Sequence, residues 1–240
     1  MIHKIRVDDL ALAVLHANAV EIRDVDGGEE PFLYSSGNWG PGYVTIKNLV
    51  GRKELMRILC EQLALRVASA APHVHVVAGN VTGGMISGWI TSGALDTLLK
   101  KQIPFVYVRD AQKKGGHKER IAGIANNPEI APGANVLVVE ELVNFSQTTC
   151  NSAVALREAG FTVTYAACLL SYENPAAMHS LREHNLNLIS LITLDALLNT
   201  AEMHQWFPQK SIAAYREFLR NPAEWQRARG LVPVLEEDTK

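Results

Sequence analysis

The sequence predicts an α/β fold with a parallel central sheet flanked by helices. From residue 73 onward, short apolar runs alternate with helical patterns, which is typical of the βα units that build a parallel sheet. One predicted strand, residues 135–139, is apolar without interruption from Val136 onward, as expected for a strand buried on both faces. The chain has 240 residues, of which 48% are hydrophobic and 20% charged. A chain of that length and composition can bury a core of its own.

The first 70 residues are expected to be organised differently. Apolar spacing predicts a helix over residues 7–22 and a second helix over 52–70. Between them, residues 24–30 form a turn because Gly27 and Gly28 lie among acidic residues. Residues 32–34 and 43–46 are predicted to be strands that pair with each other around the intervening loop.

The βα units then follow in chain order. Apolar runs predict strands at 73–78, 105–108, 135–139, 162–170 and 188–192, and helical spacing predicts helices at 85–100, 148–159, 175–184 and from 193–195 onward. Gly160 stands where a left-handed cap ends a helix. Trp89 lies at helical spacing from Met85, which predicts that its side chain belongs to the core. Residues 109–129 are polar and basic, and we expect a long loop there.

The domain organisation is predicted as one domain over residues 1–198, whose N-terminal part is residues 1–50, with an appended segment at 199–240. That segment carries aromatic residues among charged ones, which predicts a helical C-terminal extension. Its aromatic residues are Trp206, Phe207, Tyr215, Phe218 and Trp225. We expect them to form the packing surface of the extension's helices.

Composition excludes several classes of protein. The 23 Lys and Arg residues balance 25 Asp and Glu residues, so the net charge is −2, which argues against a general nucleic-acid binder. The three cysteines are odd in number, lie far apart in the chain and form no CxxC motif, so neither a disulfide framework nor a cysteine zinc site is indicated. The charged N-terminus does not resemble a signal peptide, and no apolar run is long enough to span a membrane. We therefore expect a cytoplasmic protein without a membrane or nucleic-acid partner.

Reactive groups follow the strand at 135–139. Glu140 and Glu141 come first, and a segment rich in hydroxyl and amide groups then leads into a helix. Two adjacent carboxylates can hold a sugar diol directly or through a divalent cation, and a helix start favours a phosphate. The alternative is that the acids face solvent and that Ser146 or Thr148 only caps the helix. From this segment alone the two interpretations are about equally supported.

Two further loops follow predicted strands. Residues 79–84 hold three glycines, which allow a backbone to approach an anion closely, although a simple tight turn explains them equally well. Residues 109–120 carry six side chains able to be cationic, and such a loop can close over a polyphosphate or simply be a solvated surface loop. A parallel sheet gathers the carboxyl ends of its strands at one edge, so we expect the three loops to lie together.

These motifs resemble the type I phosphoribosyltransferase family and, within it, the orotate branch. The acidic strand end at 138–142 with the loop at 144–148 resembles the family's signature, and residues 78–84 resemble its pyrophosphate loop. Residues 107–117 resemble its mobile catalytic loop. The segments 32–37, 41–47 and 191–198 resemble the orotate branch more loosely. The resemblance covers residues 8–198.

The sequence departs from the family pattern at several ligand-contacting positions. Ser146 and Gln147 replace glycines, Asn144 and Phe145 replace threonines, and the acid pair is Glu–Glu. Other departures are Ser35, Thr45, Lys47 and Asp110. Several changes of this kind indicate a changed ligand or lost catalysis.

The resemblance implies a magnesium-dependent enzyme that transfers ribose 5-phosphate from phosphoribosyl pyrophosphate to a nucleobase, with orotate favoured, in pyrimidine nucleotide biosynthesis. It implies a homodimer with shared active sites and small-molecule substrates. One alternative is a non-catalytic relative that binds a nucleotide or phosphoribosyl compound in a regulatory role. Another alternative is an enzyme of the same fold with a different chemistry. Such an enzyme would process a nucleotide, by ribosyl transfer or by hydrolysis, with the acid pair.

The resemblance also assigns roles to individual residues of this sequence. Glu140 and Glu141 would hold the ribose hydroxyls and the metal, while Ser146, Gln147, Thr148 and Thr149 would hold the 5-phosphate. Thr82, Gly83, Gly84 and Lys114 would face the pyrophosphate, and Arg109, Lys113 and His117 would act in catalysis. Phe32, Tyr34 and Ser36 would lie near the base, in an N-terminal part that the family uses as a hood.

Overall fold

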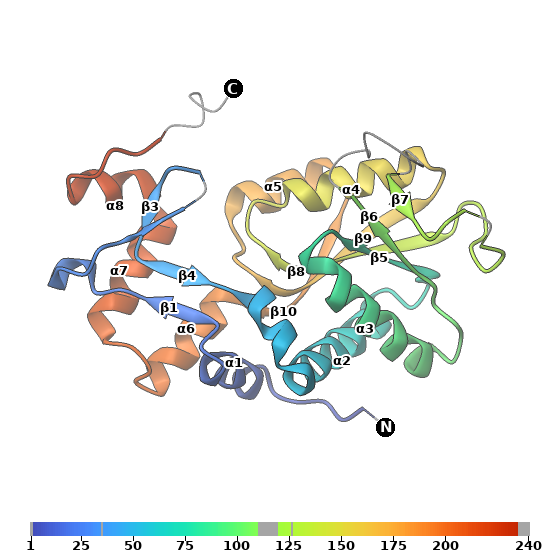
Figure 1. Ribbon diagram of the computed structural model, residues 1–240, viewed down its shortest axis with the longest axis horizontal. Helices are drawn as coiled ribbons and strands as arrows, with labels where there is room; N and C mark the ends of the chain where they lie inside the picture. The colour runs from blue at the N-terminus through green and yellow to red at the C-terminus, as the bar shows by residue number, and fades with distance from the viewer. Residues whose placement is uncertain (1, 35, 110–119, 126, 235–240) are drawn as a thin grey trace. The chain divides into compact units, whose positions relative to one another are not determined.

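A computed structural model describes the chain except residues 1, 35, 110–119, 126 and 235–240 (Figure 1). The contacts divide the chain into two compact units, each built from two segments. The first unit contains residues 1–10 and 46–195, and the second contains residues 11–45 and 196–240. The predicted α/β class is confirmed, because the first unit is built around a sheet of six strands, five of them parallel.

The central sheet has the strand order β10-β9-β8-β5-β6-β7. Its parallel strands are β5 (Val76–Asn80), β6 (Phe105–Val108), β8 (Asn135–Val143), β9 (Thr162–Ser171) and β10 (Asn187–Thr193). The short β7 (Ile121–Ala122) pairs antiparallel with β6 at one edge. The apolar run at 135–139 is buried, and β8 continues beyond it through both glutamates to Val143.

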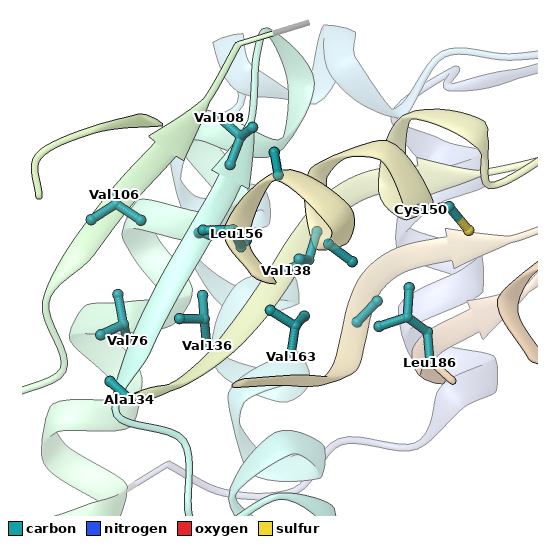
Figure 2. Packing of buried hydrophobic residues seen from close by; sticks show 14 of the residues in the cluster. Val76, Val106, Val108, Ala134, Val136, Val138, Cys150, Leu156, Val163 and Leu186 are labelled. Carbon is teal, nitrogen blue, oxygen red and sulfur yellow. The ribbon is translucent and has the colours of Figure 1, made fainter. Parts of the chain in front are cut away.

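Helices cover both faces of this sheet (Figure 1). Helices α2 (Lys53–Ala70) and α3 (Gly83–Leu99) lie on one face, and α4 (Gln147–Glu158) and α5 (Pro175–Glu183) lie on the other. Figure 2 shows the core beneath α4, where alternate side chains of the strands meet the helix. The labelled members of this cluster are Val76, Val106, Val108, Ala134, Val136, Val138, Cys150, Leu156, Val163 and Leu186.

Local chemistry explains where several of these helices begin and end. Gly160 has φ +89°, so the left-handed residue expected after α4 is present. Asn174 caps α5, since its side chain accepts a hydrogen bond from the backbone N of Ala176, and Pro175 occupies the first helical position. α6 (Leu194–Met203) follows β10 as the sequence predicts.

The second unit joins the N-terminal hairpins to the C-terminal helices. β1 (Val20–Ile22) pairs with β4 (Gly42–Val44), and β2 (Phe32–Leu33) pairs with β3 (Trp39–Gly40). Helices α7 (Gln209–Arg220) and α8 (Pro222–Ala228) bury aromatic side chains against these strands. Trp225 and Tyr215 are each 1% exposed and Phe218 is also buried, so these three aromatic residues do form a packing surface, whereas Trp206 and Phe207 are only half-buried. The sequence-based division at residue 198 follows chain order, whereas these contacts join segments that are far apart in the chain.

Two predictions for the N-terminal part are wrong. The helix predicted over residues 7–22 is α1 (Val7–His16), because Asn18 turns left-handed with φ +54° and the chain then enters β1. The strands predicted at 32–34 and 43–46 do not pair with each other; β2 pairs with β3 instead, and β4 finds its partner in β1. Short 3-10 helices follow Asp24 at Val25–Gly27 and follow β4 at Ile46–Gly51.

The prediction that Trp89 belongs to the core is also wrong. Its side chain is 65% exposed on α3, and Ile86, one turn earlier, is 42% exposed. Apart from Leu95, the buried residues of α3 are small, and they include Gly84, Ser87 and Gly88. Among the described residues, no helix is both long enough and apolar enough to cross a membrane.

Candidate active site

The alternation of side chains along β8 separates its two glutamates. Val136 and Val138 belong to the core under α4, so Glu140 points to that same face, while Glu141 points to the face of α3. β5 lies beside β8 in parallel register, with Ala78 opposite Val138. The next pair along that face is therefore Asn80 and Glu140. Two carboxylates thus lie at the carboxyl end of the central strand, one directed to each helix layer.

Glu140 is the buried member of the pair. The residue is only 5% exposed. Its Oε1 accepts hydrogen bonds from Asn80 Nδ2, from Thr148 Oγ1 at 3.2 Å and from Thr149 Oγ1 at 3.2 Å. Burial raises the pKa of Glu140 to about 7, and the nearby charge of Glu141 adds to the rise, although the three donors oppose it. Near neutral pH this carboxyl group therefore exists in both protonation states.

Glu141 lies across the start of α3. A Cβ on Gly83 would overlap the carboxylate of Glu141, so this contact requires a glycine at position 83. Burial raises the pKa of Glu141, while backbone hydrogen bonds and the charge of Lys47 lower it. The carboxylate is thus in close contact with the backbone that the sequence predicts to face a pyrophosphate.

The glycine-rich loop packs tightly against β8. A Cβ on Gly84 would overlap the backbone carbonyl of Val139, and one on Gly79 would overlap that of Gly84. Thr82 stands at the N-cap position of α3, and the peptide bond before it is cis. Thr82, Gly83 and Gly84 therefore present the N-terminal end of α3 beside Glu141, as an anion site requires.

The predicted phosphate segment begins α4, and its side chains have diverse partners. Ser146 adopts φ +61°, is buried, and donates its hydroxyl to the carbonyl of Ala177 at 3.2 Å rather than capping the helix. The hydroxyls of Thr148 and Thr149 are directed to Glu140. Gln147 is exposed, and Phe145 is 59% exposed, so the Phe145 ring lies outside the core.

Of the predicted catalytic cations, the structure describes Arg109, which follows β6. Arg109 stacks over the ring of Tyr107 at 5.2 Å, and its Nη2 donates to the Tyr107 hydroxyl at 3.0 Å. Its backbone N donates to the carbonyl of Arg120 at 2.9 Å. Lys113, Lys114 and His117 lie outside the described residues.

The predicted base-binding residues belong to the second unit. Arg23 lies over the Phe32 ring at 3.7 Å. The Tyr34 hydroxyl donates to the carbonyl of Gly42 at 2.5 Å, and its ring lies against the rings of Tyr43 and Phe218. Ser36 Oγ accepts a hydrogen bond from the backbone N of Asn38 at 3.4 Å.

Sequence reasoning did not connect two residues, Asn80 and Lys47, with the acid pair. Asn80 is 2% exposed and is a direct partner of Glu140, while Lys47 is the cation whose charge acts on Glu141. A signal for Asn80 existed, since an amide side chain is unusual inside an apolar strand that ends in a glycine-rich loop. No local pattern connects Lys47 to a strand almost a hundred residues later.

A divalent cation fits part of this donor set. Within the described residues no group of three or more His, Cys, Asp or Glu side chains is arranged to hold a metal ion. Glu140 Oε1 already accepts three hydrogen bonds, so Glu141 is the more available carboxylate. Magnesium characteristically takes one or two carboxylates and completes its shell with substrate phosphates and water. The residues therefore fit a cation that arrives with a phosphorylated substrate.

Comparison with known proteins identifies relatives over most of the chain. No protein-family model matches. The chain is 26% identical over 218 residues to the orotate phosphoribosyltransferase of Streptococcus sanguinis, covering 91% of this chain and 97% of that protein. It is 27% identical over 217 residues to the orotate phosphoribosyltransferase of Bacillus caldolyticus, covering 90% and 98% respectively.

Solved structures share the architecture. A UMP synthase structure from Leishmania donovani superposes with a TM-score of 0.69 at 20% identity, covering 90% of this chain and 42% of that longer chain. Orotate phosphoribosyltransferase from Aeropyrum pernix superposes with a TM-score of 0.61 at 24% identity, covering 80% of this chain and 99% of that one. The chain thus has the fold of the type I phosphoribosyltransferases, and in sequence it is a homologue of orotate phosphoribosyltransferases.

Proposed function

We propose that this protein is a phosphoribosyltransferase that transfers ribose 5-phosphate from phosphoribosyl pyrophosphate to orotate. The observation that carries the proposal is the pair Glu140–Glu141 at the carboxyl end of β8, between the N-terminal ends of α3 and α4. Two carboxylates suit a ribose diol, and two helix starts suit the two phosphorylated ends of the substrate. The choice of orotate as the base is supported by the relatives, which are named orotate phosphoribosyltransferase.

In this reaction the bond between C1 of the ribose and the pyrophosphate oxygen breaks, and pyrophosphate leaves with the electron pair. A ring nitrogen of the base, after losing its proton, forms the new bond to C1. The transition state has positive character on the sugar, so catalysis depends on positioning and charge stabilisation. Glu141 and Glu140 would orient the ribose, and the start of α4 at 146–149 would bind the 5-phosphate.

The leaving group would face Thr82, Gly83 and Gly84 at the start of α3. When bound with the substrate, magnesium would neutralise pyrophosphate oxygens, and Glu141 is the carboxylate best placed to bind the ion. Arg109, Lys113, Lys114 and His117 would add positive charge as pyrophosphate departs. Phe32, Tyr34 and Ser36 would contact the base. We place this activity in pyrimidine nucleotide biosynthesis in the cytoplasm, in a homodimer whose subunits share active sites.

The test mixes the chain with Mg²⁺, phosphoribosyl pyrophosphate and orotate and follows orotate absorbance together with released pyrophosphate. We expect orotate to be consumed only when all components are present. Glu141→Ala should abolish turnover, because the ribose and the metal lose their accessible carboxylate. Glu158→Ala, which removes an exposed carboxylate at the far end of α4, is the matched control and should leave turnover unchanged.

A second candidate function is a non-catalytic protein that binds a phosphoribosyl compound. The geometry at α4 favours it, since Ser146 donates to Ala177, and Thr148 and Thr149 donate to Glu140, so these hydroxyls have partners other than a phosphate. Binding of phosphoribosyl pyrophosphate without turnover of orotate or other bases would select this candidate. Absence of both binding and turnover would exclude both.

A further inference from the structure

The C-terminal segment makes a dense set of hydrogen bonds with the loop that follows β2. Asn38 Oδ1 accepts from Gln226 Nε2 at 3.2 Å and from the backbone N of Val234 at 2.9 Å, and Asn38 Nδ2 donates to the Val234 carbonyl at 3.3 Å. The backbone N of Trp39 donates to Gln226 Oε1 at 3.0 Å. Four hydrogen bonds thus connect two loop residues to two residues that lie 187 to 196 positions later in the chain.

Gln226 is the centre of this arrangement. It is 1% exposed, yet both ends of its amide have partners, since Nε2 also donates to the Pro222 carbonyl at 3.1 Å. A buried amide with all its partners in place fixes one geometry, because breaking any of these bonds leaves a buried polar group unsatisfied. Gln226 therefore holds Asn38 and Trp39 in a single position relative to α8.

The loop itself is shaped for this contact. Gly37 has φ +82°, and a Cβ there would lie 3.1 Å from Val234 Cγ2, so both the conformation and the approach of Val234 favour glycine. The Tyr34 carbonyl accepts from the backbone N of Gly37 at 2.9 Å, and the backbone N of Tyr34 donates to the Asn38 carbonyl at 2.8 Å. A position imposed at Asn38 is therefore transmitted directly to Tyr34 and Ser36.

Contacts at the other side of the hairpin have the same effect. The Tyr34 ring lies 6.0 Å from the ring of Phe218 on α7, and Phe218 packs edge-on against Trp225 at 5.4 Å. The loop is thus held by α7 through Tyr34 and by α8 and Val234 through Asn38. These contacts give the C-terminal helices and Val234 a structural role beside the loop at 36–39.

We propose that the C-terminal extension is a positioning element for the base-binding loop, with Gln226 and Asn38 as its positioning residues. The inference rests on the proposed function, because it takes Phe32, Tyr34 and Ser36 as the residues near the base. A loop that is already ordered binds its ligand without the entropy loss of ordering on binding. Loosening the Gln226–Asn38 contact should therefore weaken binding of the base and leave phosphoribosyl pyrophosphate unaffected.

The experiment measures steady-state kinetics of the full chain for orotate and for phosphoribosyl pyrophosphate separately. We expect Gln226→Leu and Asn38→Ala each to raise the KM for orotate about tenfold, the effect of losing one or two hydrogen bonds, with kcat and the other KM nearly unchanged. The double variant should show a less than additive effect, because both substitutions remove the hydrogen bond between Gln226 Nε2 and Asn38 Oδ1. Arg227→Ala, an exposed neighbour on α8, is the matched control and should leave both KM values unchanged.

Several outcomes would overturn the inference. Equal rises of both KM values would mean that the extension supports the fold in general, and additive effects in the double variant would mean that the two residues act separately. If Gln226→Leu does not fold, Asn38→Ala decides alone, since its side chain lies in a partly exposed loop. A wild-type chain that neither binds nor converts orotate overturns the proposed function and this inference with it. A wild-type chain that is active while both variants keep their orotate KM overturns only this inference.

Discussion

Glu140 combines two opposing influences on one carboxyl group. Three side-chain donors converge on its Oε1, which favours the ionised form, but its burial at the end of β8 favours the neutral form and prevails. The pKa of Glu140 is consequently raised to about 7, while the same group in an unfolded chain keeps its ordinary value near 4.5. The folded state therefore binds a proton at Glu140 over a pH range in which the unfolded state has lost it.

This difference predicts how Glu140→Gln changes stability with pH. Between pH 4.5 and about 7 the folded wild type holds more protons than its unfolded form, so its stability falls as the pH rises. A shift of this size corresponds to about 3 kcal/mol at pH 8, and glutamine, which does not titrate, avoids that loss. We expect urea unfolding to show the variant gaining stability relative to wild type from pH 5.5 to pH 8, while turnover is lost.

The comparison needs a control that removes a carboxylate without burial. Glu158→Gln changes an exposed glutamate in the last turn of α4 and is the control for loss of a carboxylate outside the site. If the stability difference between Glu140→Gln and wild type is constant with pH, Glu140 does not titrate in the folded state over this range. The three donors would then outweigh burial, and both glutamates would be ionised when substrate binds.

The residues of the acid site that are close together in the chain were predictable, whereas the contacts made by Asn80 and Ser146 were not. Glu140, Thr148 and Thr149 follow an apolar run in order, and the start of a helix brings hydroxyls back toward the strand end, so their proximity follows from local pattern. The partner Asn80 comes from another strand, and its pairing depends on the register of β5 with β8. The orientation of Ser146 toward Ala177 depends on a left-handed φ, which a serine does not signal.

Among the elements, α3 shows how glycines allow a helix to start beside a carboxylate. Gly83 and Gly84 are adjacent, yet a Cβ at each would meet a different kind of neighbour. At Gly83 it would meet the side chain of Glu141, which can rotate away. At Gly84 it would meet the backbone carbonyl of Val139, which can move only if β8 or α3 shifts. A substitution at Gly83 should therefore affect mainly ligand binding, and a substitution at Gly84 should affect mainly the stability of the fold.

We expect Gly83→Ala to weaken binding of phosphoribosyl pyrophosphate by at least tenfold while thermal stability changes little, because the displaced group is the Glu141 side chain. Gly84→Ala should instead lower the free energy of unfolding by about 1–3 kcal/mol, the usual effect of overpacking against a rigid neighbour. Isothermal titration and urea unfolding of both variants test this pair. Gly93→Ala, where a Cβ meets nothing within 4 Å, is the control. Equal stability losses at 83 and 84 would contradict the distinction.

The βα elements could be predicted because each depends on a local period, while the N-terminal hairpins could not. The strands β8 and β9 each contain a continuous apolar run, at 136–139 and 165–170, and α2 and α4 have clear helical spacing. The pairing of β1 with β4 joins Val20 to Val44, so it depends on the fold of the intervening residues. The end of α1 was missed because Asn18 takes a left-handed conformation without a glycine to mark it.

For the molecule as a whole, sequence order and compact units do not coincide. Residues 11–45 and 196–240 form one unit, since the aromatic residues of α7 and α8 need an apolar partner and the N-terminal strands supply it. Composition alone identified the extension as helical but not what it packs against. Arg229 also joins the two segments, because it forms a bidentate ion pair with Asp26 at 2.9 Å. The N-terminal strands and the C-terminal helices therefore stabilise each other within this unit.

The exposed side chains of α3 lead to a prediction about the proposed homodimer. Trp89 is 65% exposed and packs edge-on against Phe105 at a ring distance of 5.6 Å, with Ile86 on the same helix face. Large aromatic side chains that monomers leave exposed contribute disproportionately to interfaces between subunits. We therefore expect Trp89→Ser to raise the dimer dissociation constant at least tenfold, as measured by sedimentation velocity. Turnover should also fall on dilution, because the proposed active sites are shared between subunits.

The control is Met203→Ser, which changes an exposed apolar residue on α6 and should leave the mass in solution unchanged. A Trp89→Ser protein with wild-type mass at every concentration would exclude this face of α3 from the interface between subunits.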